Sequence, residues 1–496
     1  MVRTAADPTS RWDVLVIGGG ITGLATAWDA VSRGLKVALV EQDDFAKSTS
    51  SRSTKLVHGG VRYLQKGEIG LVREALHERA RLLHNAPEFT RPLRFVLPTC
   101  RPLARYYYRF GMWLYDMLAG KAGIEKARLL SRAEAREKLP GLCLKDLTGG
   151  VSYSDAQFDD AALAIAIAQA IESSGGTVLN YASVTALLSE GGEFIGAAVR
   201  DVETDQRWEM RAKVLVNATG IFSNVLRDDN GVPARWTVRT SRGSHLVCDR
   251  AALPGDHALI IPKTRDGRVL FAIPWKQHVV VGTTDVPTDG PVLDPVPDGD
   301  EIGFILEEAG RALGITATDV TSQWSGLRPL VSRARVNSTA AMSRKHIIES
   351  SPRGLISVLG GKWTTSRRMG EDAIDAAVER HGLRAPGSTT ADRPLTAHGA
   401  RPPVPNLLDE PVELEPGQLA ARVKEACRHG YARRLEDVLT RRLRLLQLDA
   451  RRAIGLAPEV AQLMANELGW TDSEKQAQLD AFIPTAESYA PSAIRG

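Results

Sequence analysis

A short stretch near the N-terminus gathers side chains that could bind an anion. Residues 49–64, TSSRSTKLVHGGVRYL, hold five Ser or Thr hydroxyls, two glycines and four basic residues, His58 included. Hydroxyls and cations donate hydrogen bonds to phosphate groups, and the fork of an arginine matches phosphate oxygens. Because the stretch closely follows a glycine-rich unit typical of nucleotide binding, these donors would lie beside a bound nucleotide.

The glycine-rich unit is GGGITG at 18–23, which follows the apolar run DVLVI and precedes a helical pattern; a second apolar run, KVALVE, ends in Glu41. In this order, Gly18 permits the tight turn, Gly20 lets a pyrophosphate approach the backbone, and Gly23 lets helix and strand pack closely. The phosphates would bind at the helix N-terminus, and Glu41 would accept from a ribose hydroxyl. The acid at position 41 disfavours a 2′-phosphorylated nucleotide but does not separate NAD from FAD.

Two later segments favour FAD, because proteins that hold this long cofactor extended use segments scattered along the chain. Residues 213–220, KVLVNATG, predict an apolar strand that ends in small residues and glycine. Residues 355–382 predict a strand, a Gly-Gly turn and a helix with Thr364 or Thr365 as N-cap. A helix N-terminus aimed at the flavin would stabilise negative charge on the reduced ring.

Three side chains elsewhere could do chemistry. Residues 233–339 alternate apolar and polar positions and predict an antiparallel sheet that would cover the flavin. Arg328 lies there in a short apolar turn, where an unpaired guanidinium would be costly, so we expect it to meet an anion or a carboxylate. His245 starts a strand, where a packed or solvated histidine is the common outcome. Lys362 follows two glycines at a strand end and could reach a phosphate or the flavin.

Several motifs occur in one order that is familiar from a single family. They are GGGITG, TSSRSTKLVHGGVRYL, YSDAQFDD, NATG, SRGSHLV, IPW with VGTTD, SGLRPL and GGKWTTSR. With them the chain closely resembles the FAD-dependent sn-glycerol-3-phosphate dehydrogenases of the aerobic, quinone-linked type, strongly over about 10–382 and more loosely beyond. The resemblance implies an α/β plus α+β fold, with a Rossmann-like FAD-binding domain, an antiparallel-sheet substrate domain and a shortened C-terminal helical cap.

The resemblance also implies boundaries. The FAD-binding segments would cover about 10–85, 150–232 and 340–382, and the substrate domain about 86–149 and 233–339. A Pro/Gly-rich linker at 383–412 would lead to the cap at 413–496.

The family's site residues carry over where the motifs match. Besides the glycines and Glu41, the resemblance assigns FAD contacts to Thr49, Ser50, Ser51, Ser53, Lys55, His58, Gly59, Gly60, Gly220, Gly361, Thr364 and Thr365. It assigns the substrate to Arg62, Tyr63 and Thr283, and the chemistry to Arg328, Lys362 and His245, the last as candidate proton acceptor.

The implied reaction is oxidation of glycerol 3-phosphate to dihydroxyacetone phosphate: hydride leaves C2 for the flavin while a base takes the hydroxyl proton. Electrons would then pass to a membrane quinone. An FAD dehydrogenase of another polyol phosphate, such as erythritol phosphate, stays open as an alternative. An FAD-dependent amino-acid or amine oxidase is the other alternative, although its carboxylate substrate would need a single cation. An oxygen-reducing relative would carry a long insertion after SGLRPL, where this chain has a short interval.

Quinone reduction needs access to a bilayer, yet the longest apolar run, 161–171, is too short to span one. Residues 101–123, rich in tyrosine with Phe110, Trp113 and basic neighbours, predict a helix lying in the headgroup layer, with a packed domain helix as an equal alternative. Cap arginines could add attraction to anionic lipid. We expect a cytoplasmic protein bound peripherally to the inner face of the cell membrane. The shortened cap leaves a homodimer open and is not expected to touch the flavin site.

Composition sets the remaining bounds. A chain of 496 residues that is 43% hydrophobic allows two or three domains, and a net charge of +4 is nearly balanced, so no nucleic-acid partner is indicated. The four cysteines are far apart and no His, Asp or Glu set has ligand spacing, so we expect neither a metal nor a disulfide framework. The polar N-terminus predicts no signal peptide.

Overall fold

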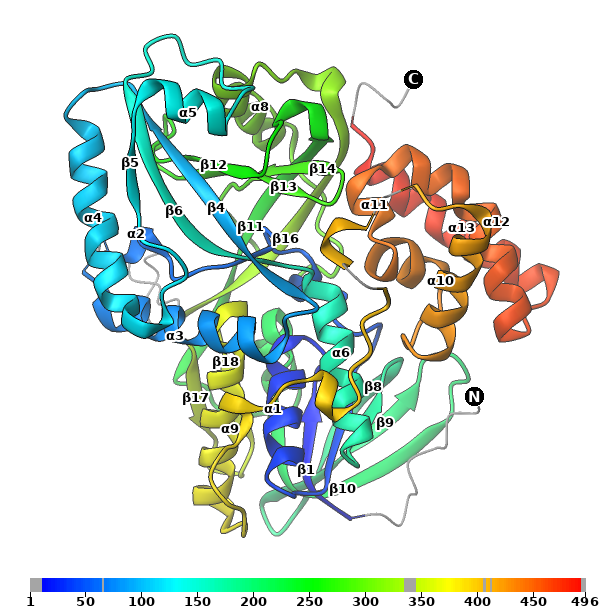
Figure 1. Cartoon of the computed structure of the whole chain (residues 1–496). Helices are drawn as coiled ribbons and strands as arrows, with labels where there is room; N and C mark the ends of the chain where they lie inside the picture. Colours follow the sequence, from blue (N-terminus) through cyan, green and yellow to red (C-terminus); the bar gives the residue numbers. More distant parts are fainter. Residues whose placement is uncertain (1–10, 65–66, 334–344, 405–406, 411–412, 492–496) are drawn as a thin grey trace.

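The computed structural model describes residues 11–64, 67–333, 345–404, 407–410 and 413–491, and the side chain of Arg62 lies outside this description. Figure 1 shows three parts: a sheet that includes the N-terminal strand, a second sheet built largely from the middle of the chain, and a group of C-terminal helices beside them.

The first sheet is mainly parallel. In the described chain its eight strands are β1 (Arg11–Ile17), β2 (Val37–Val40), β7 (Thr177–Leu179), β8 (Ala182–Glu190), β9 (Glu193–Asp201), β10 (Arg207–Asn217), β17 (Ile347–Ser350) and β18 (Ile356–Leu359). Their order is β17-β18-β10-β1-β2-β7, and β8 and β9 join through β10. Strand β1 pairs in parallel with β2 and β10, and Val14, Leu15 and Val16 are fully buried. A continuous apolar run is what a strand covered on both faces requires.

Three helices cover one face of this sheet: α1 (Ile21–Ser32), α6 (Asp160–Ser173) and α9 (Ser366–His381). Helix α1 begins directly after Gly20, its N-cap residue. Helix α9 packs closely on α1 because Gly370 has no side chain; a Cβ there would lie 2.3 Å from the carbonyl oxygen of Ala25. The short helix α7 (Ser223–Asp229) follows β10.

The second sheet carries ten described strands: β3 (Leu56–Val57), β4 (Thr90–Thr99), β5 (Arg128–Leu130), β6 (Gly149–Phe158), β11 (Trp236–Asp249), β12 (His257–Ile261), β13 (Leu270–Trp275), β14 (His278–Gly282), β15 (Val286–Thr288) and β16 (Val320–Arg333). Their pairing is antiparallel except that β12 runs parallel to β4. Strand β6 pairs with β4 from end to end, so residues 149–158 belong to this sheet.

The helices of this second part are α2 (Val61–Leu64), α3 (Ile69–Asn85), α4 (Ala104–Ala119), α5 (Arg132–Lys138) and α8 (Gly299–Leu313). Helix α8 is amphipathic, begins with a capping box between Asp298 and Glu301, and ends at Gly314 in the left-handed conformation. Its buried face joins the apolar cluster on the side of the sheet that includes Leu246 and Val281.

The segment after α9 crosses the first part before it reaches the cap. The side chain of Asn85 donates to the carbonyl oxygens of Thr390 and Ala391, and the Nζ of Lys276 donates to that of Leu407 at 2.7 Å. These contacts fasten the predicted linker to the second part of the protein at two points.

The cap consists of α10 (Pro416–Arg428), a π-helical turn (Asp437–Arg442), α11 (Leu445–Leu448), α12 (Ala450–Leu468) and α13 (Asp472–Tyr489). Its apolar core is continuous with Trp275 and Trp324 of the second sheet. We expected cap arginines to attract lipid, and for Arg441, Arg442 and Arg444 this is wrong, because all three are turned into the protein and paired with carboxylates of the first part.

The fold class expected from the sequence is confirmed: a Rossmann-like unit, a mainly antiparallel second sheet and a C-terminal helical cap. No helix in the described part of the chain combines the length and apolar character that crossing a bilayer requires.

Candidate active site

Two adjoining cavities lie between the sheets. The larger, of about 500 Å³, and the smaller, of about 330 Å³, share Thr49, Pro329, Gly361, Lys362 and Trp363 in their walls. A ligand that fills both would therefore be long. This is the shape that an extended dinucleotide needs.

The smaller cavity fits the nucleotide half of FAD. It is lined by Gly18, Gly20 and the start of α1, where the backbone N–H groups of a helix N-terminus favour phosphate. Gly18 has φ +108°, and a Cβ at Gly23 would lie 1.8 Å from the carbonyl oxygen of Gly18. Only glycine is compatible with both positions. Gly220, also in the wall, has φ +57°.

Glu41 directly follows β2 and lies in the wall of this cavity. Its carboxylate accepts from the N–H of Gly19 at 2.6 Å and from that of Asp43 at 3.0 Å. Burial, with added repulsion from Asp43 and Asp44, raises the pKa of Glu41 to about 7, although the two N–H groups favour its charged form. The position is the one that a ribose-binding acid takes after the second strand of a dinucleotide unit.

Residues 46–54 form the wall between the cavities. Ser50 faces the nucleotide side and its hydroxyl accepts from the N–H of Ile21 at 2.9 Å, which ties the wall to the start of α1. Thr49 borders both cavities and donates to the carbonyl oxygen of Leu327 at 2.6 Å. The indole of Trp363 donates to the carbonyl oxygen of Ser50 at 2.8 Å.

Strand register brings the candidate chemical groups together in the larger cavity. In the pairing of β11 with β16, His245 lies opposite Trp324, and Ser241 lies opposite Arg328. The guanidinium of Arg328 lies over Gly243, where a Cβ would come within 2.3 Å of Nη2. Arg328 donates to the Oγ1 of Thr283 at 3.0 Å and lies 3.3 Å from the Oδ1 of Asp285. The expectation that Arg328 meets an anion or carboxylate is thus realised in part by Asp285.

His245 is buried, and its ring stacks on Trp324 with centroids 4.1 Å apart. Its Nε2 lies 3.0 Å from the Oγ1 of Thr54, and within the described residues Nδ1 has no hydrogen-bond partner. Burial, followed by the charges of Arg328 and Lys55, lowers the pKa of His245 well below its usual value. A neutral imidazole is the form that can accept a proton.

Lys362 borders both cavities, and its Nζ lies 3.6 Å from the ring centroid of Tyr63, as in a cation–π contact. The turn that presents it uses Gly361, with φ +87°. Arg62 belongs to α2 next to Tyr63, and its side chain is outside the described structure.

The remaining predicted FAD residues divide between cavity wall and supporting structure. Ser53, His58, Gly60, Gly361 and Thr364 line the larger cavity. Thr365 and Ser51 do not: Thr365 donates to the carbonyl oxygen of Lys362, and Ser51 is buried behind the wall. The N–H of Gly59 donates to the hydroxyl of Tyr115 at 2.9 Å.

The side chain of Lys55 lies behind the wall, away from both cavities. Its Nζ is fully buried, 2.9 Å from the Oδ2 of Asp160 and 2.7 Å from the carbonyl oxygen of Ser51. A buried ammonium needs such partners, and burial still lowers the pKa of Lys55 to about 7. Ser53 donates to the same Asp160 at 2.6 Å.

Several residues of the site were not singled out from the sequence. Thr54 contacts His245, and Asp285 contacts Arg328. Asp155, in the cavity wall, is held by Tyr115 and by Arg79 at 2.6 Å. Asp155 and Asp285 stand inside motifs that carried the resemblance, YSDAQFDD and VGTTD, so a signal existed for them. No local pattern marked Trp324, because its role depends on strand register. Nowhere in the described ranges do three or more His, Cys, Asp or Glu side chains meet as a metal site would require.

Comparisons with known proteins agree with this geometry. A family model described as FAD dependent oxidoreductase matches residues 13–375, and one described as C-terminal domain of alpha-glycerophosphate oxidase matches residues 356–475. The chain is 38% identical to the mitochondrial glycerol-3-phosphate dehydrogenase of Homo sapiens, over 95% of this chain and 72% of that protein. It is 35% identical to a mitochondrial glycerol-3-phosphate dehydrogenase of Arabidopsis thaliana, over 99% of this chain and 88% of that one.

Solved structures place the whole chain in the same fold. The glycerol-3-phosphate dehydrogenase from Bacillus halodurans, complexed with FAD, superposes with a TM-score of 0.79 at 28% identity, covering 99% of this chain and 97% of that one. An L-alpha-glycerophosphate oxidase from Mycoplasma pneumoniae shares the fold at a TM-score of 0.60 and 17% identity, covering 77% of this chain and 97% of that one. The chain therefore belongs to the family of FAD-dependent glycerol-3-phosphate dehydrogenases.

Proposed function

We propose that this protein oxidises sn-glycerol 3-phosphate to dihydroxyacetone phosphate. The observation that carries the proposal is a buried histidine, His245, whose pKa is held well below its usual value by burial, in one cavity with the guanidinium of Arg328 and joined to a cavity that fits a dinucleotide. Bound FAD supplies the acceptor for the hydride that leaves C2 of the substrate. Curated relatives named for this dehydrogenase support the choice of substrate.

The protein's own groups handle the proton and the charge. His245 accepts the proton of the C2 hydroxyl, and Trp324 and Thr54 hold its ring in place. The positive charge of Arg328 stabilises the negative charge that builds on the substrate oxygen, while Asp285 and Thr283 orient the guanidinium. Lys362, whose Nζ contacts the ring of Tyr63, binds the phosphate of the substrate together with Arg62, the sequence neighbour of Tyr63.

Anaerobic flavin reduction tests the substrate directly. The holoenzyme is mixed without oxygen with glycerol 3-phosphate, erythritol phosphate, glycerol and a set of amino acids, and bleaching of the flavin absorbance is followed. We expect fast bleaching with glycerol 3-phosphate and dihydroxyacetone phosphate as the product. Faster bleaching by erythritol phosphate would assign another polyol phosphate, and bleaching by an amino acid alone would assign an amine oxidase.

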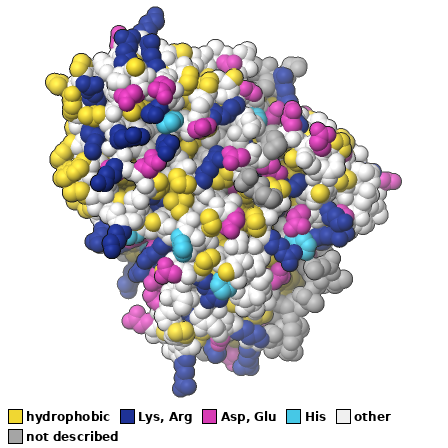
Figure 2. All heavy atoms as spheres, in the orientation of Figure 1, with side chains coloured by type: hydrophobic (Ala, Val, Ile, Leu, Met, Phe, Trp, Pro, Cys, Tyr) yellow, Lys and Arg dark blue, Asp and Glu magenta, His cyan; other side chains and the backbone are white. Residues whose placement is uncertain are grey.

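We further propose that the electrons pass to a quinone in the membrane, which the protein contacts peripherally from the cytoplasmic side. Helix α4 supports this proposal, because it exposes Tyr106, Tyr107, Phe110, Trp113 and Met117 to solvent. Figure 2 shows hydrophobic side chains gathered at the edge of the molecule where α4 lies in Figure 1, with basic side chains close by. Exposed apolar groups next to basic ones are typical of interfacial helices.

The same helix borders the larger cavity. Tyr107, Tyr108, Phe110 and Leu114 of α4 line it together with Phe95 and other apolar residues of the second sheet. One end of the cavity is therefore polar, at Arg328, and the other is apolar and next to the exposed face of α4. An apolar acceptor that leaves the bilayer at α4 would reach the site without crossing water.

A further inference from the structure

The wall between the two cavities is held from behind by the cap. We call residues 43–55 the wall segment, and Arg441, Arg442, Arg444 and Gln447 the cap clamp. All members of the cap clamp are buried, or nearly so, against the first part of the protein. Arg441 and Arg442 are the last residues of the π-helical turn Asp437–Arg442, Arg444 and Gln447 follow it, and Arg444 itself has φ +65°. An irregular backbone of this kind points successive side chains in directions that a regular helix would not allow.

On its front the wall segment makes three contacts that the site needs. Ser50 accepts from Ile21 at the start of α1, where the phosphates of FAD would bind. Thr49 donates to Leu327, the residue before Arg328. Thr54 contacts His245. A shift of this segment would therefore disturb the nucleotide site, the guanidinium and the base together.

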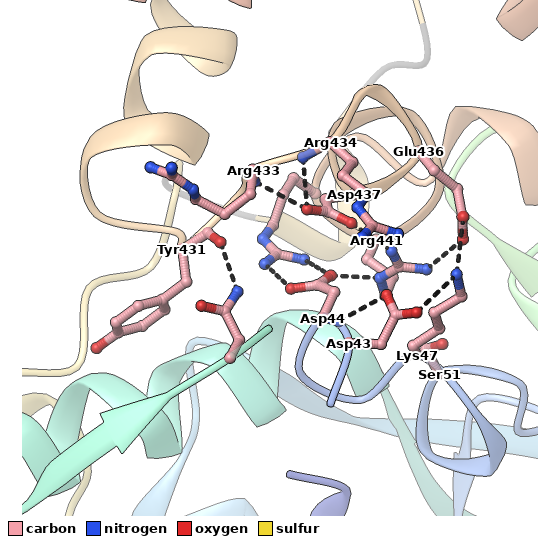
Figure 3. Close-up of polar contacts among 12 residues, drawn as sticks. Asp43, Asp44, Lys47, Ser51, Tyr431, Arg433, Arg434, Glu436, Asp437 and Arg441 are labelled. Carbon is pink, nitrogen blue, oxygen red and sulfur yellow. Dashed lines mark hydrogen bonds and ion pairs between the residues drawn. The ribbon is translucent and has the colours of Figure 1, made fainter. Parts of the chain in front are cut away.

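On its rear the first anchor is Asp44, which is fully buried. Arg442 binds both of its oxygens, with two contacts of 2.7 Å, and the Nε of Arg441 donates to the same carboxylate. Arg441 also donates to Glu436 at 2.9 Å and to Asp437 at 2.7 Å, and Glu436 accepts from Lys47 of the wall segment at 3.0 Å. Figure 3 shows Arg441 among carboxylates that come from both sides of this interface.

The second anchor is the carbonyl oxygen of Ser51, midway along the wall segment. It accepts from Gln447 at 3.1 Å and from Lys55 at 2.7 Å, with Arg444 at 3.4 Å. Arg444 donates to Asp160 at 2.5 Å, and Asp160 also holds Ser53 and Lys55. No described residue of the cap lines either cavity, but these contacts lie directly behind the wall between them.

Buried ion pairs contribute little net stability relative to apolar packing, since desolvation offsets their attraction. They do select one geometry, because a carboxylate held by two guanidinium forks has few alternative positions. An interface that needed only adhesion could have been apolar here, as it is around Trp275 and Trp324.

We infer that the cap positions the wall segment for FAD and for His245, with the four residues of the cap clamp as positioning residues. The inference rests on FAD binding in the cavities and goes beyond the proposed reaction, since it does not depend on which polyol phosphate is oxidised. A cap that loosens its hold would release flavin from a protein whose sheets remain folded.

The test compares Arg441→Met with Arg422→Met. Arg422 is a matched control: it is a buried cap arginine paired with Glu410, and its other contact is the carbonyl oxygen of Arg442 at 3.4 Å. Flavin is stripped from each full-length protein, circular dichroism at low temperature confirms folding, and FAD affinity is measured by quenching of flavin fluorescence.

We expect Arg441→Met to bind FAD at least about tenfold more weakly than the parent, which is a typical coupling between two sites. The affinity of Arg422→Met for FAD should lie within about twofold of that of the parent. A purely structural role would lower the melting temperatures of both apoproteins and leave both affinities unchanged. Equal FAD affinities in the two folded variants would overturn the inference.

Gln447→Met keeps the inference testable if Arg441→Met fails to fold. It removes one neutral hydrogen bond to the carbonyl oxygen of Ser51 and leaves no buried charge unpaired. We expect weaker FAD binding by about fivefold, near the lower end for such couplings. Unchanged binding in Gln447→Met would contradict the inference even if Arg441→Met could not be purified. Failure of the proposed reaction would show instead as tight FAD binding without bleaching by polyol phosphates.

Discussion

The hydroxyl of Thr54 lies 3.0 Å from the Nε2 of His245, so the wall segment and the candidate base are joined by one direct contact. The two residues come from different parts of the fold, since Thr54 precedes β3 and His245 lies in β11. Trp324 covers one face of the imidazole, and Gly282 leaves room beside it, where a Cβ would lie 2.4 Å from Cδ2. The ring is thereby fixed in position, as an effective proton acceptor requires.

Thr54→Val keeps the shape of the side chain and removes its hydroxyl. We expect kcat for glycerol 3-phosphate to fall about tenfold, the effect of one neutral hydrogen bond of roughly 1.4 kcal/mol, with KM nearly unchanged. Steady-state kinetics with a soluble dye acceptor measure both constants. A rise in KM alone would mean that Thr54 contacts substrate and does not orient His245.

His245→Gln removes the base and retains a polar side chain of similar length. We expect anaerobic flavin reduction to slow by about 10²–10⁴-fold, the usual contribution of general-base catalysis. FAD content, read from the absorbance of the purified protein, should match the parent. A reduction rate close to that of the parent would show that another group accepts the proton.

The pH dependence of the free enzyme follows from the low pKa of His245. Burial disfavours the imidazolium, so the folded pKa lies well below 6.5 and the neutral base persists as pH falls through that value. We expect kcat/KM for the poor substrate glycerol to stay level through pH 6.5 and to decline only at clearly lower pH. Glycerol is chosen because it lacks a phosphate that would titrate near pH 6. A decline centred at or above pH 6.5 would contradict a neutral, buried His245.

Lys362→Met tests recognition of the substrate phosphate. Loss of a charge-assisted contact of about 2 kcal/mol should raise KM for glycerol 3-phosphate about 30-fold. The kinetics of glycerol should change little, and this comparison serves as the internal control. An equal effect on both substrates would place Lys362 at the flavin and not at the phosphate.

Glu41→Ala should weaken retention of FAD, because the acceptor for a ribose hydroxyl is lost together with the partner of the Gly19 N–H group. We expect an increase in the FAD dissociation constant of about tenfold, within the range for hydrogen bonds to charged groups. Glu41→Gln keeps a hydrogen-bond acceptor, so its dissociation constant for FAD should lie between those of the parent and of Glu41→Ala. Full flavin occupancy of Glu41→Ala after extensive dialysis would show that the assignment is wrong.

Membrane contact through α4 is tested with Leu103→Ser, Trp113→Ser and Met117→Ser combined. These side chains are exposed and are not part of the cavity wall. We expect the triple variant to lose sedimentation with anionic vesicles and activity with vesicle-bound quinone, and to keep activity with a soluble dye, since apolar insertion is lost.

The matched control replaces Val292 and Val296, which are exposed apolar residues elsewhere on the chain, by serine. This variant should bind vesicles like the parent. If the triple variant still reduces quinone in vesicles at the parental rate, the contact with the membrane does not involve α4.

The sequence alone determined the dinucleotide unit. Local geometry requires glycine at two of its positions: Gly18 has a positive φ, and the carbonyl oxygen of Gly18 lies too close to Gly23 for a side chain there. The spacing of these glycines can therefore be recognised in the sequence alone. The alternation of apolar and polar residues in 233–339 also predicted antiparallel strands, whereas no sequence pattern placed β6 in the second sheet. The direction of the Arg328 side chain could be anticipated in part, since an apolar setting demands an anionic partner.

Tertiary structure decided which side chains face the cavities. Lys55 and the cap residues Arg441, Arg442 and Arg444 look like further cations of an anion site or a lipid surface, yet each pairs with a carboxylate brought from a distant segment, Asp160 or Asp44. Likewise, the pKa of His245 is lowered by burial and by the charges of Arg328 and Lys55, and the pairing of β11 with β16 brings Trp324 and Arg328 into the site. Burial and charge partners set the pKa and the direction of such groups, and in this protein both come from residues far away in sequence.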